Sequence, residues 1–350
     1  MNKDNVTHVP ANLLEKLCEA ALDSRNVRSD VRQHVVSSLI QTSLRGVDSH
    51  GIELLPHYIN ALDAGRINPR PTYQWMQELP SADVLNADHT FGHAAGGEAM
   101  LTAINMAKET GIAAVAVKNS THFGAAAYFS LLAAEQDLIG LSFTHADALM
   151  LSFRGTRPFF GTNPICLAAP VANESPFCLD MATSLVSWNK VLRSKNAQEQ
   201  VPDDWGCDSS GTPVTDPNEI ISLLPIGNYK GFGLSMMIEI LCGILTGMPY
   251  GRNIIRMYAD PIGQKRYLGH FYIAIDINAF IGLEKFKLCL QEMMNAVREE
   301  PSQESEIPIQ VPGDPEKQIY NQRYKQGIPV SPTAYERLRN LGKEINFEAI

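Results

Sequence analysis

Apolar residues near the N-terminus recur every three or four positions, which is the period of an amphipathic helix. This pattern predicts two helices, over residues 12–18 and 31–40, with Asn12 as a candidate N-cap of the first. A third, shorter helix is predicted over 53–64, because Gly65 follows it as a C-terminal stop signal. The first part of the chain is therefore expected to be helical.

The pattern changes after the Pro-rich loop at 68–71, where we place a domain boundary. Two short β-branched apolar runs, 112–117 and 139–144, flank a helical pattern over 125–136, and this order is typical of a βαβ unit. The stretch 231–245 is apolar almost all round, which predicts a buried helix. Further strands are predicted at 165–169, 177–179 and 271–277, and further helices at 92–108 and 184–194.

Composition narrows the class of protein. The chain has 350 residues, 45% hydrophobic and 19% charged, which provides a core and excludes a mostly disordered chain. Lys and Arg number 29 against 38 Asp and Glu, a net charge of −9, so broad nucleic-acid binding is disfavoured. Apolar runs are interrupted before about 18 residues and the first ten residues are polar, so we expect no membrane span and no secretory signal.

Several short motifs that would identify a chemistry are missing. The six cysteines are isolated, without C-x-x-C, which favours reduced thiols in a cytoplasmic chain over a zinc ribbon or a redox pair. No H-E-x-x-H is present, and we predict no metal site. The chain also lacks G-x-G-x-x-G after a strand, G-x-x-x-x-G-K-[ST] and G-x-S-x-G. An ordinary Rossmann dehydrogenase, a P-loop enzyme and an α/β-hydrolase are therefore disfavoured.

Two histidines lie in dense polar clusters. His50, in Asp48-Ser49-His50-Gly51, is a candidate acid/base group or substrate hydrogen-bond donor, although an Asx-type turn with a solvated histidine would explain the cluster equally simply. His122 follows a predicted strand, and ligands of α/β sheets bind at the carboxyl ends of strands. A helix-capping loop is the alternative there. Thr144-His145-Ala146-Asp147 occupies the corresponding end of the next strand.

Two further clusters favour an anionic ligand. Asp180 follows a predicted strand, and Thr183 and Ser184 stand at a helix start, where backbone N–H groups attract anions. Lys230 stands beside two glycines at the start of the predicted helix 231–245, so its ammonium and the exposed backbone suit a phosphate or carboxylate. A surface lysine is the alternative for that position.

Together these clusters resemble the malate/L-lactate dehydrogenase-2 family. The matching strings come in the family's order and at about its spacing, and they are Ser49-His50-Gly51, Thr121-His122-Phe123-Gly124, Gly161-Thr162-Asn163-Pro164, Asp180-Met181-Ala182-Thr183-Ser184, Leu223-Leu224-Pro225, Lys230-Gly231-Phe232-Gly233-Leu234 and Pro312-Gly313-Asp314-Pro315-Glu316. Each string is short, but jointly they identify the chain as a member.

The resemblance implies an α/β fold with a non-Rossmann NAD(P)-binding domain. Residues 73–299 would form this domain around a mixed sheet, and residues 1–72 would pack with the C-terminal helices of 300–350 as a helical part. The resemblance also implies a homodimer whose active sites lie between the domains, NAD or NADP as cofactor, and a small-molecule substrate. It does not distinguish NAD from NADP.

Site residues are carried over from the family resemblance, most of them within the matching strings. His122 resembles the family's acid/base residue, and His50 resembles a second pocket histidine that has the proton-transfer role in some relatives. Ser49, His50 and Tyr58 match substrate-binding positions. The positions that match cofactor contacts are Ala146, Asp180, Met181, Ala182, Lys230, Gly313, Asp314 and Pro315.

One position departs from the family pattern. Relatives usually have Arg three residues after Ser-His-Gly, where it would pair with a substrate carboxylate, but here the residue is Leu54. Either another cation such as Arg45 or Arg154 takes that role, or the substrate is not a simple 2-oxo acid.

The expected reaction moves a hydride between NAD(P)H and C2 of a small 2-oxo or 2-hydroxy acid of the malate, lactate, ureidoglycolate or sulfolactate type. Reduction of a sugar, a neutral carbonyl compound or a cyclic imine is the alternative, as is a ligand-binding member without the usual activity.

Overall fold

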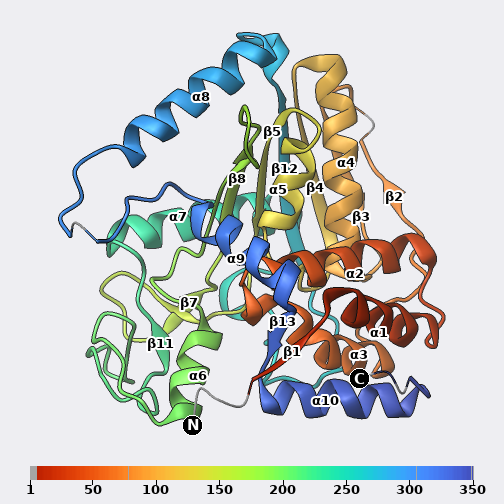
Figure 1. Ribbon diagram of the computed structural model, residues 1–350. Helices are drawn as coiled ribbons and strands as arrows, with labels where there is room; N and C mark the ends of the chain where they lie inside the picture. The colour runs from red at the N-terminus through yellow and green to blue at the C-terminus, as the bar shows by residue number, and fades with distance from the viewer. Residues whose placement is uncertain (1–5, 78, 305, 348, 350) are drawn as a thin grey trace.

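A seven-stranded mixed sheet forms the centre of the computed structural model, which describes residues 6–77, 79–304, 306–347 and 349 (Figure 1). β12 (Leu268–Asp276) lies between β4 (Ile112–Ser120) and β5 (Leu138–Thr144), antiparallel to both. The sheet order is β2-β3-β4-β12-β5-β8-β9, with β2 at Gln74–Trp75, β3 at Ala82–Asn86, β8 at Ile165–Ala169 and β9 at Phe177–Met181. The mixed sheet expected from the resemblance is thus confirmed.

The predicted βαβ unit is present, but its two strands are not neighbours. β4 and β5 run the same way on either side of β12, and among the described strands of this sheet only β3 and β4 pair in parallel. β12 alternates in its contacts: Tyr272 and Ala274 belong to the core on one face, while Phe271 and Ile273 pack on the other. β12 comes from far along the chain, and burial of both its faces stabilises it between β4 and β5.

Helices cover both faces of the sheet. α4 (Gly92–Thr110) and α5 (Ala127–Ala134) pack on one face, and α7 (Tyr229–Glu239), continued by a π-helical turn at Ile240–Ile244, packs on the other. The prediction that 231–245 is a buried helix is wrong for the single chain. One side of this helix is open, with Met236, Met237, Ile240, Ile244 and Leu245 between 40% and 57% exposed.

The two ends of the chain share one apolar core. α1 (Ala11–Asp23), α2 (Ser29–Leu44) and α3 (Leu55–Asp63) pack with α10 (Pro332–Glu344). β1 (Thr7–Val9) pairs with β13 (Ile328–Val330), and α9 (Asp314–Gln326) leads into this pair. The N-cap of α1 is Pro10 and not Asn12, because the helix begins two residues earlier than an N-cap at Asn12 would allow.

A small four-stranded sheet completes the fold beside the main sheet. Its order is β10-β11-β6-β7, with β10 at Gly206–Cys207, β11 at Ser222–Leu223, β6 at Met150–Leu151 and β7 at Pro158–Phe160. Strands of two or three residues carry no periodic signal, so the sequence could not show them. The helix predicted at 184–194 begins later, as α6 (Trp188–Ala197), and α8 (Leu283–Arg298) crosses the far end of the main sheet (Figure 1).

The helices within the described ranges are too short or too polar to span a lipid bilayer. The six cysteines are free, and the two that approach each other, Cys166 and Cys178, have sulfur atoms 3.9 Å apart without a bond.

Candidate active site

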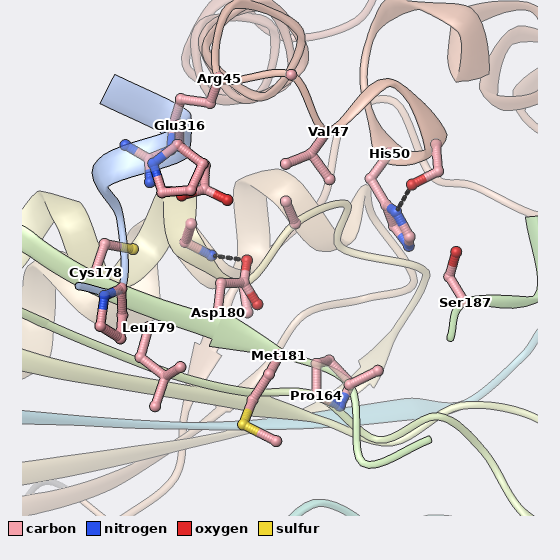
Figure 2. Close-up of a pocket in the computed structure, with 18 of the residues that line it drawn as sticks. Arg45, Val47, His50, Pro164, Cys178, Leu179, Asp180, Met181, Ser187 and Glu316 are labelled. Carbon is pink, nitrogen blue, oxygen red and sulfur yellow. Dashed lines mark hydrogen bonds between the residues drawn. The ribbon is translucent and has the colours of Figure 1, made fainter. Parts of the chain in front are cut away.

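A cavity of about 1000 Å³ lies where the main sheet, the segment after α2 and the segment before α9 meet. Most of its walls come from residues 45–50, 124–127, 178–182, 184–187, 310–313 and 315–316. Figure 2 shows Arg45, Glu316 and Asp180 toward one end and His50 and Ser187 toward the other. This volume is at the upper end of the range for small-molecule sites, which suits an extended ligand such as a dinucleotide.

The predicted catalytic and substrate residues gather at the His50 end. The His50 ring stacks on that of His122, with centroids 5.6 Å apart and planes 23° apart. The Tyr58 hydroxyl lies 2.7 Å from Nδ1 of His122, and the Ser49 hydroxyl lies 2.8 Å from Nδ1 of His50. Of these residues, Ser49 and His50 line the large cavity, while Tyr58 and His122 stand directly behind His50 around a small space of about 10 Å³.

Local packing fixes the loop that carries His122. A Cβ on Gly92, the first residue of α4, would lie 2.4 Å from the carbonyl oxygen of Thr121, so only glycine lets the helix start approach this loop. The Thr121 hydroxyl accepts a hydrogen bond from the Gly92 N–H at 3.0 Å and donates to the Thr90 carbonyl at 3.0 Å. His122 is thereby fixed against the helix start.

The turn that carries His50 is held from two sides. Arg323 of α9 donates to both oxygens of Asp48 and to the Ser43 carbonyl oxygen. The Asn189 amide on α6 donates to the Ser49 carbonyl at 2.9 Å. The Asp48–His50 turn is therefore clamped between the C-terminal part of the chain and the small-sheet region.

Both imidazoles of the pair are neutral at pH 7. Burial lowers the pKa of His50 to about 4. Burial, together with the charges of His50 and Arg266, holds the pKa of His122 well below its ordinary value, and burial raises the pKa of the Tyr58 phenol. The Gly124 N–H donates to Nδ1 of His122 at 3.4 Å, so the proton of the neutral ring lies on Nε2.

Three of the predicted cofactor residues, Asp180, Met181 and Ala182, line the cavity on β9 and just after it. The first N–H of α5, from Ala127, donates to Asp180 Oδ2 at 2.8 Å, and burial raises the pKa of this carboxyl to about 6. The carboxylate is thus held in place by a helix start while its other oxygen remains available to a ligand.

Gly313 and Pro315 also line the cavity, whereas Asp314 points away from it. Gly313 has φ +97°, and a Cβ there would lie 3.2 Å from the Cys178 amide nitrogen. Asp314 pairs with Arg298 at 2.6 Å, and Arg298 also pairs with Glu174 at 2.9 Å, which holds the pKa of Glu174 at about 2. Asp314 therefore positions the loop from behind.

Ala146 and Lys230 do not line the cavity. The Ala146 N–H donates to the Asn163 side chain at 3.0 Å, and Thr162 and Pro164 on either side of Asn163 do line it. Lys230 is exposed, one turn after the lining residue Ile226. Both positions are thus one layer away from the cavity wall.

The cavity has further lining residues that were not among the predicted site residues, although Gly124 and Glu316 belong to the matching strings. They are Gln310, Glu316, Ser187, Lys190 and Arg193, together with the small residues at 124–127. α6 shows an ordinary amphipathic pattern with a charged outer face, and nothing in that pattern marks which charges face a cavity. Leu54 packs against the helical core and is not among the lining residues.

Comparison with known proteins shows the family to which the chain belongs. The sequence matches the profile of the malate/L-lactate dehydrogenase family over residues 9–339, and the chain belongs to this family. It is 33% identical over 357 residues to malate dehydrogenase of Pyrococcus abyssi, covering 99% of this chain and 97% of the relative.

Other relatives carry different names. The chain is 32% identical over 326 residues to ureidoglycolate dehydrogenase (NAD(+)) of Escherichia coli K12, covering 92% of this chain and 91% of the relative. It is 32% identical over 284 residues to (2R)-3-sulfolactate dehydrogenase (NADP(+)) of Chromohalobacter salexigens, covering 80% and 85%. The solved malate dehydrogenase of Entamoeba histolytica superimposes with a TM-score of 0.93 at 28% identity, covering 98% and 99%.

The buried neutral histidines predict sensitivity to acid. His50, His93, His122 and His270 have pKa values lowered by burial, to about 3 for His93 and His270, against about 6.5 in the unfolded chain. Below pH 6.5 the unfolded state binds protons that the folded state does not, so stability falls as pH falls, by at most about 1.4 kcal/mol per pH unit for each histidine.

Asp180 has the opposite effect on stability between pH 6 and 4. Its folded pKa of about 6 lies above the unfolded value, so its protonation stabilises the folded state as pH falls, but it contributes only one proton. We expect the free energy of unfolding in urea to decrease from pH 7.5 to 5. An unchanged or rising value over this range would show that the histidines titrate normally in the folded protein.

Proposed function

We propose that the chain transfers a hydride between NAD(P)H and C2 of a small 2-oxo or 2-hydroxy acid of the malate, lactate, ureidoglycolate or sulfolactate type. As a member of this family it is a dehydrogenase that uses NAD or NADP. The observation that carries the proposal is the stacked His50–His122 pair, which stands at one end of a cavity of about 1000 Å³ and has the Tyr58 hydroxyl on Nδ1 of His122. The bound reduced nicotinamide supplies the hydride.

The cavity suits this cofactor in shape and chemistry. The small side chains at 124–127 leave room beside the start of α5, and the Asp180 carboxylate can accept from ribose hydroxyls. We propose that Asp180, Met181, Ala182, Gly313 and Pro315 contact the cofactor, and that Asp314 holds their loop. Ala146 and Lys230 remain proposed contacts, because each adjoins a lining segment. In this proposal the mixed sheet binds a dinucleotide without a Rossmann motif.

We further propose that the chain works as two parts, 1–72 with 300–350 and 73–299. The cavity draws Arg45 and His50 from the first part and Asp180 from the second, as a site between domains requires. Free cysteines support a cytoplasmic location, because close thiols such as Cys166 and Cys178 persist in a reducing compartment.

His122 is the proposed acid/base residue. In the resting neutral ring Tyr58 donates to Nδ1 and the proton lies on Nε2. In the reduction direction the ring takes up a proton with the substrate anion, donates the Nε2 proton to the substrate oxygen as C2 receives the hydride, and keeps the Nδ1 proton facing the Tyr58 oxygen. Because a hydroxyl both donates and accepts, Tyr58 serves both tautomers. His50 closes one face of the ring against water and binds the substrate with Ser49.

The lowered pKa of His122 gives the two directions different pH profiles. Reduction needs the scarce imidazolium, so kcat/KM for a 2-oxo acid should rise about ten-fold per pH unit as pH falls from 8 to 6.5. Oxidation needs the neutral ring and should stay nearly constant there. Steady-state rates in both directions test this, and a common inflection near pH 6.5 would contradict it.

Removal of the acid/base residue should abolish turnover without affecting cofactor binding. We expect His122→Gln to lower kcat by about 10²- to 10⁴-fold, the usual contribution of a positioned acid/base group. The dissociation constant of NADH or NADPH, measured by fluorescence, should be unchanged. His8→Gln, at an exposed position in β1, is the matched control. Full activity of His122→Gln would place proton transfer elsewhere.

The ion pairs behind the Gly313 loop should influence cofactor affinity. Arg298→Gln removes a guanidinium that pairs with both Asp314 and Glu174 and leaves Lys317 as their remaining cationic partner, so the loop is held less firmly. We expect the dissociation constant of the cofactor to rise about ten-fold, which corresponds to 1.4 kcal/mol. Arg339→Gln, which removes only an exposed pair with Glu336, is the control. Equal affinities in the two variants would show that the loop needs no such support.

The open side of α7 supports a homodimer. Its exposed apolar residues include Met236, Met237, Ile240 and Ile244, and a second copy would bury them as the sequence pattern predicts. Sedimentation should give twice the chain mass of 38.6 kDa. Ile240→Glu should give monomers, while Leu79→Glu, exposed in a loop elsewhere, should not. A dimeric Ile240→Glu variant would place the interface on another face.

A further inference from the structure

We infer that Arg193 of α6 receives the substrate carboxylate at the His50 end of the cavity. This inference rests on the proposed function, because it names the group that recognises the acid. Arg193 would then replace the arginine that relatives usually have at the position of Leu54.

The start of α6 is tied to the turn that carries His50. The Ser187 hydroxyl caps the helix by accepting from the Lys190 N–H at 3.3 Å. Asn189, in the first turn, donates to the Ser49 carbonyl at 2.9 Å. Arg193 follows one turn later, and its Nη2 lies 3.8 Å from a carboxylate oxygen of Glu53, three residues after His50. Arg193 is thus held beside the turn and lines the cavity.

The two buried arginines near the histidines already donate to other groups of the protein. Arg66 donates to the carbonyl oxygens of Gln264, Met257 and Pro261. Arg266 pairs with Asp147 and donates to the Ile255 carbonyl. The space beside them is about 10 Å³, enough for no more than one water molecule. Neither arginine lines the large cavity, so neither is placed to receive a carboxylate that binds there.

The two cations considered from the sequence are also poorly placed. Arg45 lines the cavity, but Figure 2 shows it toward the end that holds Glu316 and Asp180, away from His50. Arg154 is exposed, packs over the Phe153 ring at 5.2 Å and is not a lining residue. Within the described part of the chain, the cations that line the cavity on the His50 side are Lys190 and Arg193.

Of these two, Arg193 is the better anion receptor. The Lys190 ammonium lies over the Trp205 ring at 4.5 Å, an interaction it would have to leave. The Arg193 side chain is 57% exposed, and its 3.8 Å contact with Glu53 is longer than the 2.7–2.9 Å of a charge-assisted hydrogen bond. Glu53 is itself held by the Ser331 N–H at 3.1 Å. The N–H groups of the Arg193 guanidinium are therefore free to bind a carboxylate through two parallel bonds.

The test compares Arg193→Gln with the wild-type protein in reduction of oxaloacetate, pyruvate and sulfopyruvate. For the acid turned over fastest, we expect KM to rise about 10- to 100-fold, the loss of roughly one to two charge-assisted bonds. kcat should change much less, and the dissociation constant of the cofactor should be unchanged, which also shows that the variant is folded. Arg193→Lys should recover part of the affinity, since it retains the charge but not the fork.

Lys195→Gln is the matched control, because Lys195 is exposed on the same helix but does not line the cavity. A normal KM in Arg193→Gln, with wild-type turnover of an acid, overturns the assignment of Arg193 and leaves the proposed function intact. A wild-type protein that binds the cofactor and reduces none of the acids overturns both.

Discussion

The contact between the His50 and His122 rings is the constraint on which the rest of the site depends. It joins a turn of the helical N-terminal segment to a loop at the end of a central strand. Neither element could hold this contact alone. The Arg323–Asp48 pair and the Asn189–Ser49 bond hold the turn that carries His50. The close approach of Gly92 to the Thr121 carbonyl supports the loop that carries His122. The two chain ends and the small-sheet region thus all meet at one pair of imidazoles.

This arrangement links chemistry to stability. Burial of His50 and His122 keeps both rings neutral, so that the resting pair binds no proton and repels no neighbouring cation such as Arg266. The same burial makes acid unfolding easier. A bound substrate anion shifts the protonation equilibrium of His122, because a negative charge beside the ring favours the imidazolium form that reduction requires. Proton uptake is therefore coupled to binding of the acid and not to the resting protein.

The sequence could predict the parts of this site that rely on local strings. His50, His122, Asp180 and Gly313 stand in such strings, and the structure brings them to one cavity or directly behind it. The sequence could not predict that β12 lies between β4 and β5, since strand order depends on long-range packing. Nor could it separate Asp314, which supports the loop, from its neighbours that line the cavity. Arg193 lies on a helix face with several charged residues, so its sequence position does not show that it lines the cavity. The apolar pattern of α7 predicts a buried helix, and only the fold shows that one side of it is open.

The proposed reaction is reduction of an acid by a nicotinamide cofactor at the histidine pair of this cavity. The most direct test follows the loss of absorbance of NADH and of NADPH with oxaloacetate, pyruvate and sulfopyruvate, beside the methyl ester of pyruvate as a neutral analogue. We expect turnover with at least one free acid and one of the two cofactors, and little with the ester. Cofactor binding without oxidation by any acid, or faster reduction of the ester than of every acid, would contradict it.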